Sequence, residues 1–426
     1  MSRPRLRHAL AALFVVSSAT TASASTYEVD SIAGLQSRIR GAMPGDVIVV
    51  KDGTYITSGP ITIDRRGTKD KPIRIAAKTA GGAIVAGDGG FDVVSPAAYV
   101  EIDGFRLTHQ AGKTQVHPGA THIRFAHDVF ECAGEGAYLT IAGDDAEVDR
   151  SEFRNKKTLG NMIDVRGAGT QVAQRVHIHH SYFHDFANAG GNGAETIRFG
   201  LSGLSMSKGF GVIEHNLFVR CTGENELMSI KSGSNIIRDN TLLDSAGAQL
   251  TLRHGNDNIV SGNYLRGTDG IRIFGDRQQV FSNYLEANTG GINIGNGDGE
   301  VADGAPLTSH DRPDDCVISF NTLVNNTRNY YMSPRANGLG ATRTTFADNI
   351  IDGGGEAATL PGPYPGGVWR GNIIWHTAGL GAVPPGTFLA VDPATASLAG
   401  LPHPRILPGA ATPLGPEDLL ELIRTR

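Results

Sequence analysis

The sequence predicts an all-β protein, a β-solenoid in which short strands wind into stacked coils. A short motif recurs along most of the 426-residue chain, which is the first observation behind this prediction. The second is composition: 56 glycines with only 40% hydrophobic residues favour short strands and tight turns. The repeating region also lacks long segments of helical periodicity. Repeats of this kind bury their apolar positions by stacking on their neighbours.

The repeating motif is a small residue, often Asn, followed by aromatic or aliphatic residues and a turn, as in HNLFVRC (215–221) and DNTLLDS (239–245). Asn tolerates the left-handed backbone of a tight corner, and stacked Asn amides can hydrogen-bond from coil to coil. An all-β sandwich would not keep one marker at nearly constant spacing. The intervals cluster near 23 residues between the markers Gly104, Asp128, Ser151, Ser181, Asn216, Asn240, Asn263, Asn283, Asn321, Asn349 and Asn372.

Elements at the two ends are expected to close the solenoid. Asp30 and Ser31 can cap a short helix that ends near Gly41. The apolar face of this helix would consist of Ile32, Leu35 and Ile39. A Pro- and Ala-rich tail, about residues 380–426, is expected to pack along the coils. We find no linker, so residues 25–426 are interpreted as one domain, and capped ends favour a monomer.

The longest interval between markers contains the polar insert NGDGEVADGAPLTSHDRPDD, residues 296–315. Its Asp and Gly residues are compatible with a Ca²⁺-binding loop. However, it lacks the D-x-D-x-D-G-x₅-E pattern of such loops. We therefore favour a flexible wall beside a groove.

Residues 1–24 are typical of a secretory signal, with a basic start, an apolar run at 9–16 and the cleavage site Ala22-Ser23-Ala24. The apolar run is too short to span a bilayer, and no later segment is long and apolar enough. We expect a soluble exported protein, secreted or periplasmic, with no membrane partner.

The net charge of −5 argues against nucleic acid as a partner, because nucleic-acid binding usually needs a basic surface. A polyanion would have to be held by a local cluster of cations. The three cysteines are odd in number and lack metal-ligand spacing. We expect buried or free thiols at Cys132, Cys221 and Cys316.

Four copies of one phrase, an aliphatic residue, a cation and a nearby glycine, supply such a cluster. If each phrase is a strand of one coil, the aliphatic residues point inward and the cations stack outward on one face. We call this predicted row the cationic ladder, and its members are Arg198, Lys231, Arg253 and Arg272.

Acidic residues precede the second of these phrases. Glu224 and Glu226 are two apart, so in a strand they point the same way, and Asn192 lies one coil earlier beside Glu195. One amide oxygen and two carboxylates converging across adjacent coils suit a hard cation such as Ca²⁺. The alternative is a solvated acidic edge.

Lys231 follows these acids and is adjacent to Arg253 on the next coil. Like charge disfavours a protonated lysine, so a cation and a metal nearby would suit Lys231 to act as a base; the alternative is a basic surface without chemistry. A metal, a base and a row of cations fit elimination from a uronate, where neutralising the carboxylate stabilises an enolate-like transition state. Glycoside hydrolysis by Glu224 and Glu226 would leave the cations without a role.

At these residues the chain resembles polysaccharide lyase family 6, which includes alginate lyases and chondroitinase B. The matching text is NGAETIRFG, then NLFVRCTGENELMSIKSGSNIIRDNTL, then LTLRHGNDNIVSGNYLRG and GIRIFG, with a further match in KDGTYITSGPITI. The resemblance covers most of residues 27–375. It implies a right-handed parallel β-helix and a lyase acting on a uronate polysaccharide, most simply alginate.

The resemblance also implies residue roles. Lys231 would abstract the C5 proton, and Arg253 would lie at the leaving O4. His254 and Arg272 would line the subsites, as Arg198 of the ladder would. The residues implied to hold Ca²⁺ are Asn192, Glu224 and Glu226. Because a guanidinium keeps its proton, we expect Arg253 to stabilise charge, with the proton coming from water or His254.

Two rival functions remain at this point. A lyase of chondroitin or dermatan sulfate should carry extra basic residues for sulfate, and the loops at 156–176 and 288–315 are not notably basic. A non-catalytic solenoid that binds acidic polysaccharide is the other rival. Loss of Lys231 would abolish turnover in a lyase, but would weaken binding alone in a binding protein.

Overall fold

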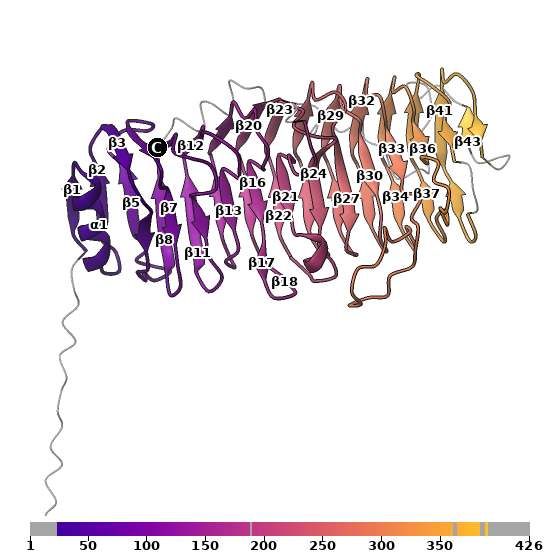
Figure 1. Cartoon of the computed structure of the whole chain (residues 1–426). Coiled ribbons are helices and arrows are strands. Elements are labelled where there is room, and N and C mark those ends of the chain that lie inside the picture. The colour runs from indigo at the N-terminus through magenta and orange to yellow at the C-terminus, as the bar shows by residue number, and fades with distance from the viewer. Residues whose placement is uncertain (1–23, 188–189, 361–363, 384–387, 391–426) are drawn as a thin grey trace, which may run out of the picture.

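The computed structural model describes residues 24–187, 190–360, 364–383 and 388–390. Within them the chain forms one long solenoid of stacked coils, with α1 at one end and β43 near the other (Figure 1). Three long parallel sheets run along its length. The predicted right-handed parallel β-helix is confirmed.

We call the sheet that contains β1 sheet 1, the sheet that contains β4 sheet 2 and the sheet that contains β3 sheet 3. Sheet 1 consists of β1 (Thr26–Val29), β2 (Val47–Val50), β5 (Ile73–Ala77), β8 (Ala98–Asp103), β11 (Thr121–Ala126), β14 (Glu147–Asp149), β19 (His177–His179), β22 (Val212–Glu214), β25 (Ile236–Arg238), β28 (Ile259–Ser261), β31 (Gln279–Phe281), β34 (Val317–Ser319), β37 (Thr345–Ala347) and β40 (Val368–Arg370). Sheet 2 consists of β4 (Ile61–Ile63), β7 (Phe91–Val93), β10 (Gln115–Val116), β13 (Leu139–Ile141), β16 (Ile163–Val165), β21 (Ile197–Phe199), β24 (Glu226–Lys231), β27 (Gln249–His254), β30 (Ile271–Ile273), β33 (Ile292–Ile294), β36 (Tyr330–Tyr331), β39 (Ala358–Thr359) and β42 (Gly381–Ala382). Sheet 3 consists of β3 (Gly53–Thr57), β6 (Ala83–Gly87), β9 (Arg106–Leu107), β12 (Val129–Phe130), β15 (Glu152–Arg154), β20 (Tyr182–Phe186), β23 (Leu217–Cys221), β26 (Thr241–Leu243), β29 (Tyr264–Arg266), β32 (Tyr284–Glu286), β35 (Thr322–Val324), β38 (Ile350–Asp352), β41 (Asn372–Trp375) and β43 (Phe388–Ala390). Between β16 and β19 the chain adds the hairpin β17 (Gly167–Ala168) and β18 (Gln171–Val172), and a 3₁₀ turn η1 (Ser202–Leu204) follows β21.

The N-terminal helix α1 (Ile32–Gly41) confirms the predicted cap. The Ser31 side chain accepts a hydrogen bond from the Gly34 amide at 3.1 Å, which satisfies one of the free donors of the first turn. Leu35 and Ile39 are buried, and the Gln36 amide bonds the backbone of Thr62 in β4. The helix therefore covers the open end of the first coil.

The asparagine ladder is confirmed, but its backbone conformation was wrongly predicted. Asn amides hydrogen-bond from coil to coil at 2.9–3.1 Å, in the order Asn216, Asn240, Asn263, Asn283, Asn321, Asn349 and Asn372. The left-handed residue is the one before each Asn, as at His215, Asp239 and Ser282. The Asn itself follows the corner, because its amide must point into the coil to reach the backbone and amide of its neighbours.

The three cysteines are free and buried, as predicted. Among the described residues, no helix is long and apolar enough to cross a membrane. The predicted signal, apart from Ala24, lies outside the described residues, as does most of the predicted tail. The described parts of that tail, β42 and β43, add strands to the last coils.

Candidate active site

The outer face of sheet 2 carries the predicted site residues. Aliphatic and aromatic residues such as Ile197, Phe199 and Ile230 are fully buried inside the coils, which turns the alternate residues outward. Arg198, Lys231, Arg253 and Arg272 therefore lie on one face, as predicted.

The cations do not form the single row that the sequence suggested. Arg198 is in register with Ser229, Thr251 and Arg272, whereas Lys231 pairs with His254 after a register shift. The prediction of one cationic ladder is thus wrong in register. The bulge in the pairing of β24 and β27, both longer than their neighbours, brings Lys231 beside His254 instead.

Three carboxylates gather beside these cations. Glu195 precedes β21, Glu224 precedes β24 and Glu226 begins β24, and their oxygens lie within 4.8 Å of one another. We call these residues the carboxylate cluster. Glu195 and Glu226 are only 1% exposed. Burying a carboxylate costs free energy unless it has a cationic or hydrogen-bonding partner, so three carboxylates this close together need such partners.

Two members of the carboxylate cluster are held by cations. Lys231 Nζ donates to Glu195 at 2.9 Å, and the Asn161 amide donates to the other Glu195 oxygen at 2.8 Å. Burial opposes ionisation of Glu195, but Lys231 on balance lowers its pKa. Glu226 accepts close hydrogen bonds from Arg253 and Arg272. The predicted base and the predicted O4 group thus each contact the cluster directly.

Glu224 is held differently. It accepts hydrogen bonds from the backbone amides of Gly193 and Ala194, at 2.6 and 3.2 Å. Burial and the charge of Glu195 raise its pKa above the usual range. The same loop carries Asn192, whose side chain is exposed. The structure therefore brings two of the three predicted metal ligands together, places the loop of the third against Glu224 and adds Glu195.

His254 is a neutral imidazole in this site. It is 5% exposed, and burial together with His310 and the neighbouring cations lowers its pKa to about 3. Its Nδ1 is buried without a hydrogen-bond partner among the described residues. His254 can therefore offer a polar atom to a substrate without adding charge.

Arg198 is in the site but is already paired. Its guanidinium makes a bidentate contact with Asp164 on β16, at 2.9 and 2.8 Å. It also lies 3.9 Å from Glu195. Arg272 is less strongly balanced, because burial lowers its pKa against the opposing effect of Glu226. Both predicted subsite residues are thus paired within the protein, and each shares its carboxylate with a second arginine, Arg198 with Arg166 and Arg272 with Arg253.

Sequence reasoning missed two residues that contact the site from outside sheet 2, His310 and Arg335. The ring of His310, in the insert 296–315, lies 5.4 Å from that of His254 and 5.1 Å from that of Phe274. Arg335 lies over Phe274 and 3.3 Å from His310. The direction in which the insert folds could not be read from the sequence. Glu195 carried a signal, because it stands next to the predicted ligand loop.

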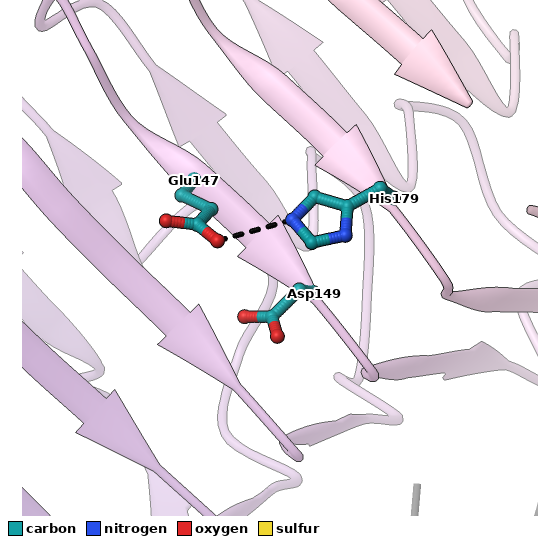
Figure 2. A group of neighbouring side chains, drawn as sticks. All are labelled: Glu147, Asp149 and His179. Carbon is teal, nitrogen blue, oxygen red and sulfur yellow. Dashed lines mark hydrogen bonds and ion pairs between the residues drawn. The ribbon is translucent and has the colours of Figure 1, made fainter. Parts of the chain in front are cut away.

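A second group of metal-ligand type lies on sheet 1, where Figure 2 shows Glu147, Asp149 and His179. We call it the paired cluster. Arg124 binds both oxygens of Asp149 at 2.8 Å, and His179 contacts Glu147 at 3.0 Å. Every member therefore has a partner within the protein, and the group needs no ligand.

Comparisons with known proteins agree with this geometry. A family model described as chondroitinase B matches residues 29–341. A polysaccharide lyase of family 6 from Pseudopedobacter saltans is 19% identical, with a TM-score of 0.74 over 94% of this chain and 99% of that chain. A family 6 alginate lyase in complex with a trisaccharide is 21% identical, with a TM-score of 0.70 over 82% and 85%. At these identities, the two structures show a shared fold.

The alginate lyase AlyGC is 25% identical, with a TM-score of 0.74 over 86% of this chain. This chain spans about half the length of AlyGC, 53% of it. No curated protein matches the chain. Since the family model covers well over half of the residues, the chain belongs to the chondroitinase B family, polysaccharide lyase family 6, and is a polysaccharide lyase.

Proposed function

We propose that the protein cleaves alginate by cation-assisted β-elimination, leaving a 4,5-unsaturated product. The observation that carries this proposal is the convergence of Lys231, Arg253 and the carboxylate cluster on the outer face of sheet 2. Hydrolysis would need two carboxyl groups free to act as acid and base. Here two of the three carboxylates are held by Lys231, Arg253 and Arg272, which favours elimination.

We propose that the carboxylate cluster holds Ca²⁺, with Asn192 as a further ligand. The fit rests on the donor set: three carboxylates with oxygens within 4.8 Å suit a hard cation. Glu224 has backbone amide partners and a raised pKa, so its charge is the least compensated of the three. When bound, Ca²⁺ would neutralise the uronate carboxylate and so favour loss of the neighbouring proton.

Lys231 is proposed as the base. Lys231 would first have to lose the ammonium proton of its ion pair with Glu195 to solvent. The free amine would then take the C5 proton, and the electron pair left on C5 would form the C4–C5 double bond as the C4–O4 bond breaks. The Lys231 side chain is 13% exposed and is held by Glu195, which fixes the amine on the outer face of β24. This position supports the proposal that the sugar chain binds along the outer face of sheet 2.

Arg253 is proposed to stabilise the charge that develops on O4. Its guanidinium keeps its proton in proteins, so it is not the proton donor. Of the two predicted donors, water is proposed to supply the proton to O4, because the lowered pKa of His254 leaves its imidazole neutral beside Lys231. Arg272 and Arg198 are proposed to bind the neighbouring sugar carboxylates.

The choice of alginate is supported by relatives whose names state that activity. Three of the structures compared are alginate lyases, two of them named as family 6, and a fourth is a mannuronic acid specific family 6 lyase from human gut microbiota. The family model itself is that of chondroitinase B, so dermatan and chondroitin sulfate remain the substrates to test against alginate.

Ultraviolet absorbance of the unsaturated product tests the proposal. The mature protein is incubated separately with alginate, chondroitin sulfate and dermatan sulfate, with and without a chelator. A rise on alginate that is lost in Lys231→Ala is expected. A rise confined to the sulfated polymers would show that they, and not alginate, are the substrates. No rise on any polymer would contradict the proposed elimination.

We also propose that the protein is exported as a monomer after removal of residues 1–24. The basic and apolar pattern of that segment supports this. N-terminal sequencing of protein from the cell exterior or the periplasm should begin at Ser25. Light scattering should give the mass of one chain.

A further inference from the structure

The insert 296–315 is fastened to the turn that follows β30. The Gly275 amide donates to the Asp311 carbonyl at 3.1 Å, and the Arg277 amide donates to the Asp314 carbonyl at 2.8 Å. Asp276 stands between these two anchor points. The carboxylate of Asp276 and that of Asp311 therefore belong to two segments that are held against each other.

Both carboxylates are short of partners. Asp311 is 2% exposed, and its Oδ1 accepts the Val301 amide at 2.8 Å. Its Oδ2 is buried without a hydrogen-bond partner among the described residues, and so is Oδ1 of Asp276. An unsatisfied carboxylate oxygen in such a place is costly, because a charge needs solvent or a counter-charge.

The surrounding charges increase this cost. Asp303 and Asp314 are near both residues, while Arg277 lies 3.7 Å from the other oxygen of Asp276. Arg277 is itself shared with Asp257 and Asp303. Burial and this acidic surrounding raise the pKa of Asp276 to about 7 and that of Asp311 to about 6. The two buried, unpartnered carboxylate oxygens therefore favour a bound proton or a bound cation.

We propose that Asp276 and Asp311 bind a divalent cation, Ca²⁺, at a site separate from the carboxylate cluster. Carboxylate oxygens are the ligands that Ca²⁺ and Mg²⁺ prefer, and backbone carbonyls and water would complete the shell. The paired cluster of Figure 2 lacks this feature, since Arg124 and His179 already satisfy its acids. The unpaired oxygens, rather than the number of acids, distinguish the site.

A cation bound here would affect the candidate active site through the insert 296–315. His310, next to Asp311, contacts His254 and Phe274 with its ring, and Asp298 of the insert binds Arg335 at 2.5 Å. Fixing Asp311 would therefore fix His310 against His254 and Phe274. This consequence rests on the proposed function, whereas cation binding itself does not.

Calorimetric titration of the chelated full chain with Ca²⁺, and separately with Mg²⁺, tests the proposal. The Glu224→Gln background weakens the other cation site. In that background, one equivalent of Ca²⁺ should still bind, raise the Tm and slow hydrogen exchange in the insert. Adding Asp276→Asn or Asp311→Asn should remove all three effects. These substitutions keep the side-chain shape, and circular dichroism verifies folding.

Asp315→Asn is the matched control. Asp315 lies in the same acidic segment but is exposed and paired with Arg343 at 2.8 Å, so its loss should leave the titration unchanged. If the two carboxylates share a proton instead, Asp311→Asn would leave the Tm measured without Ca²⁺ unchanged or raise it. In that case Ca²⁺ would also leave hydrogen exchange in the insert unchanged. That result would overturn the proposal. A response to Mg²⁺ alone would correct the ion.

The test also separates this inference from the proposed function. Ca²⁺ binding that depends on Asp311, in a protein without lyase activity, would refute the function and leave the site. Lyase activity without binding at Asp311 would do the reverse.

Discussion

The outer faces of sheets 1 and 2 carry similar residues and differ in how their charges are satisfied. On sheet 1, Asp149 has a bidentate partner in Arg124, and Glu147 has His179. On sheet 2, Glu195, Glu224 and Glu226 crowd within 4.8 Å, and Glu224 is left with backbone amides. The first face joins coils by internal ion pairs. The second leaves charge for a ligand.

This difference shows how to separate structural from functional acids in a solenoid. Stacking brings like residues together at every coil, so clusters of acids and histidines are expected on any face. A cluster of acids indicates a functional site when its carboxylates are buried but lack enough partners within the protein to balance their charge. Variants on the two faces should therefore differ in turnover, Ca²⁺ binding and stability.

Lys231→Ala should lower turnover by about 10³-fold, because removing a positioned general base typically costs that much. Binding of alginate should be retained. His179→Gln, on the face with paired charges, is the control and should keep wild-type turnover. The measurement is the initial rate of product absorbance beside calorimetric binding. Equal losses of rate in both variants would erase the distinction between the faces.

Glu224→Gln should weaken Ca²⁺ binding at the carboxylate cluster by more than about 10- to 100-fold, the usual cost of mutating a residue that only supports a metal ligand. Turnover should fall accordingly and recover in part at high Ca²⁺. Glu147→Gln removes an acid from the paired cluster and should leave both quantities unchanged. Rate measured against free Ca²⁺ distinguishes the variants. If the rates of both variants depend on free Ca²⁺ as the wild-type rate does, neither acid is a ligand.

Arg124→Met should lower the free energy of unfolding by about 2 kcal/mol, because Asp149 is then left buried with Arg150 alone. Its kcat should not change. Arg253→Met should show the opposite pattern, with a small change in stability and a large loss of kcat, since Arg272 still contacts Glu226. Urea unfolding and initial rates provide the two readings. A loss of activity in Arg124→Met would contradict the assignment of sheet 1.

The histidines of sheet 1 should make stability fall in mild acid. Burial, then the neighbouring His179, His215 and Arg150, lowers the pKa of His180 to about 4, and burial also lowers that of His177. The unfolded chain therefore binds protons first, so stability is lost as the pH falls from about 6.5 towards 4. His180→Asn, which suits the left-handed backbone there, should recover about 1 kcal/mol of this loss after solvent screening. Urea unfolding at several pH values measures it, and an unchanged pH slope would refute it.

The sequence by itself determined the solenoid and the face on which the candidate site residues lie. Its marker residues repeat near 23, which identifies the coils, and the alternation around Ile197 and Ile230 turns Arg198 and Lys231 outward. Side-chain direction in a strand has period two, so this conclusion needs no tertiary information. The capping helix and the free cysteines followed equally directly.

Only the tertiary structure decided register and partners. Strand pairing sets Lys231 opposite His254 through a bulge, and a bulge adds a residue that no repeat spacing announces. The contacts of Glu195 with Lys231, and of His310 with His254, join positions far apart in the chain. Whether a charge is compensated depends on such contacts. The sequence could therefore locate the acids of this protein, but not show which of them are left for a ligand.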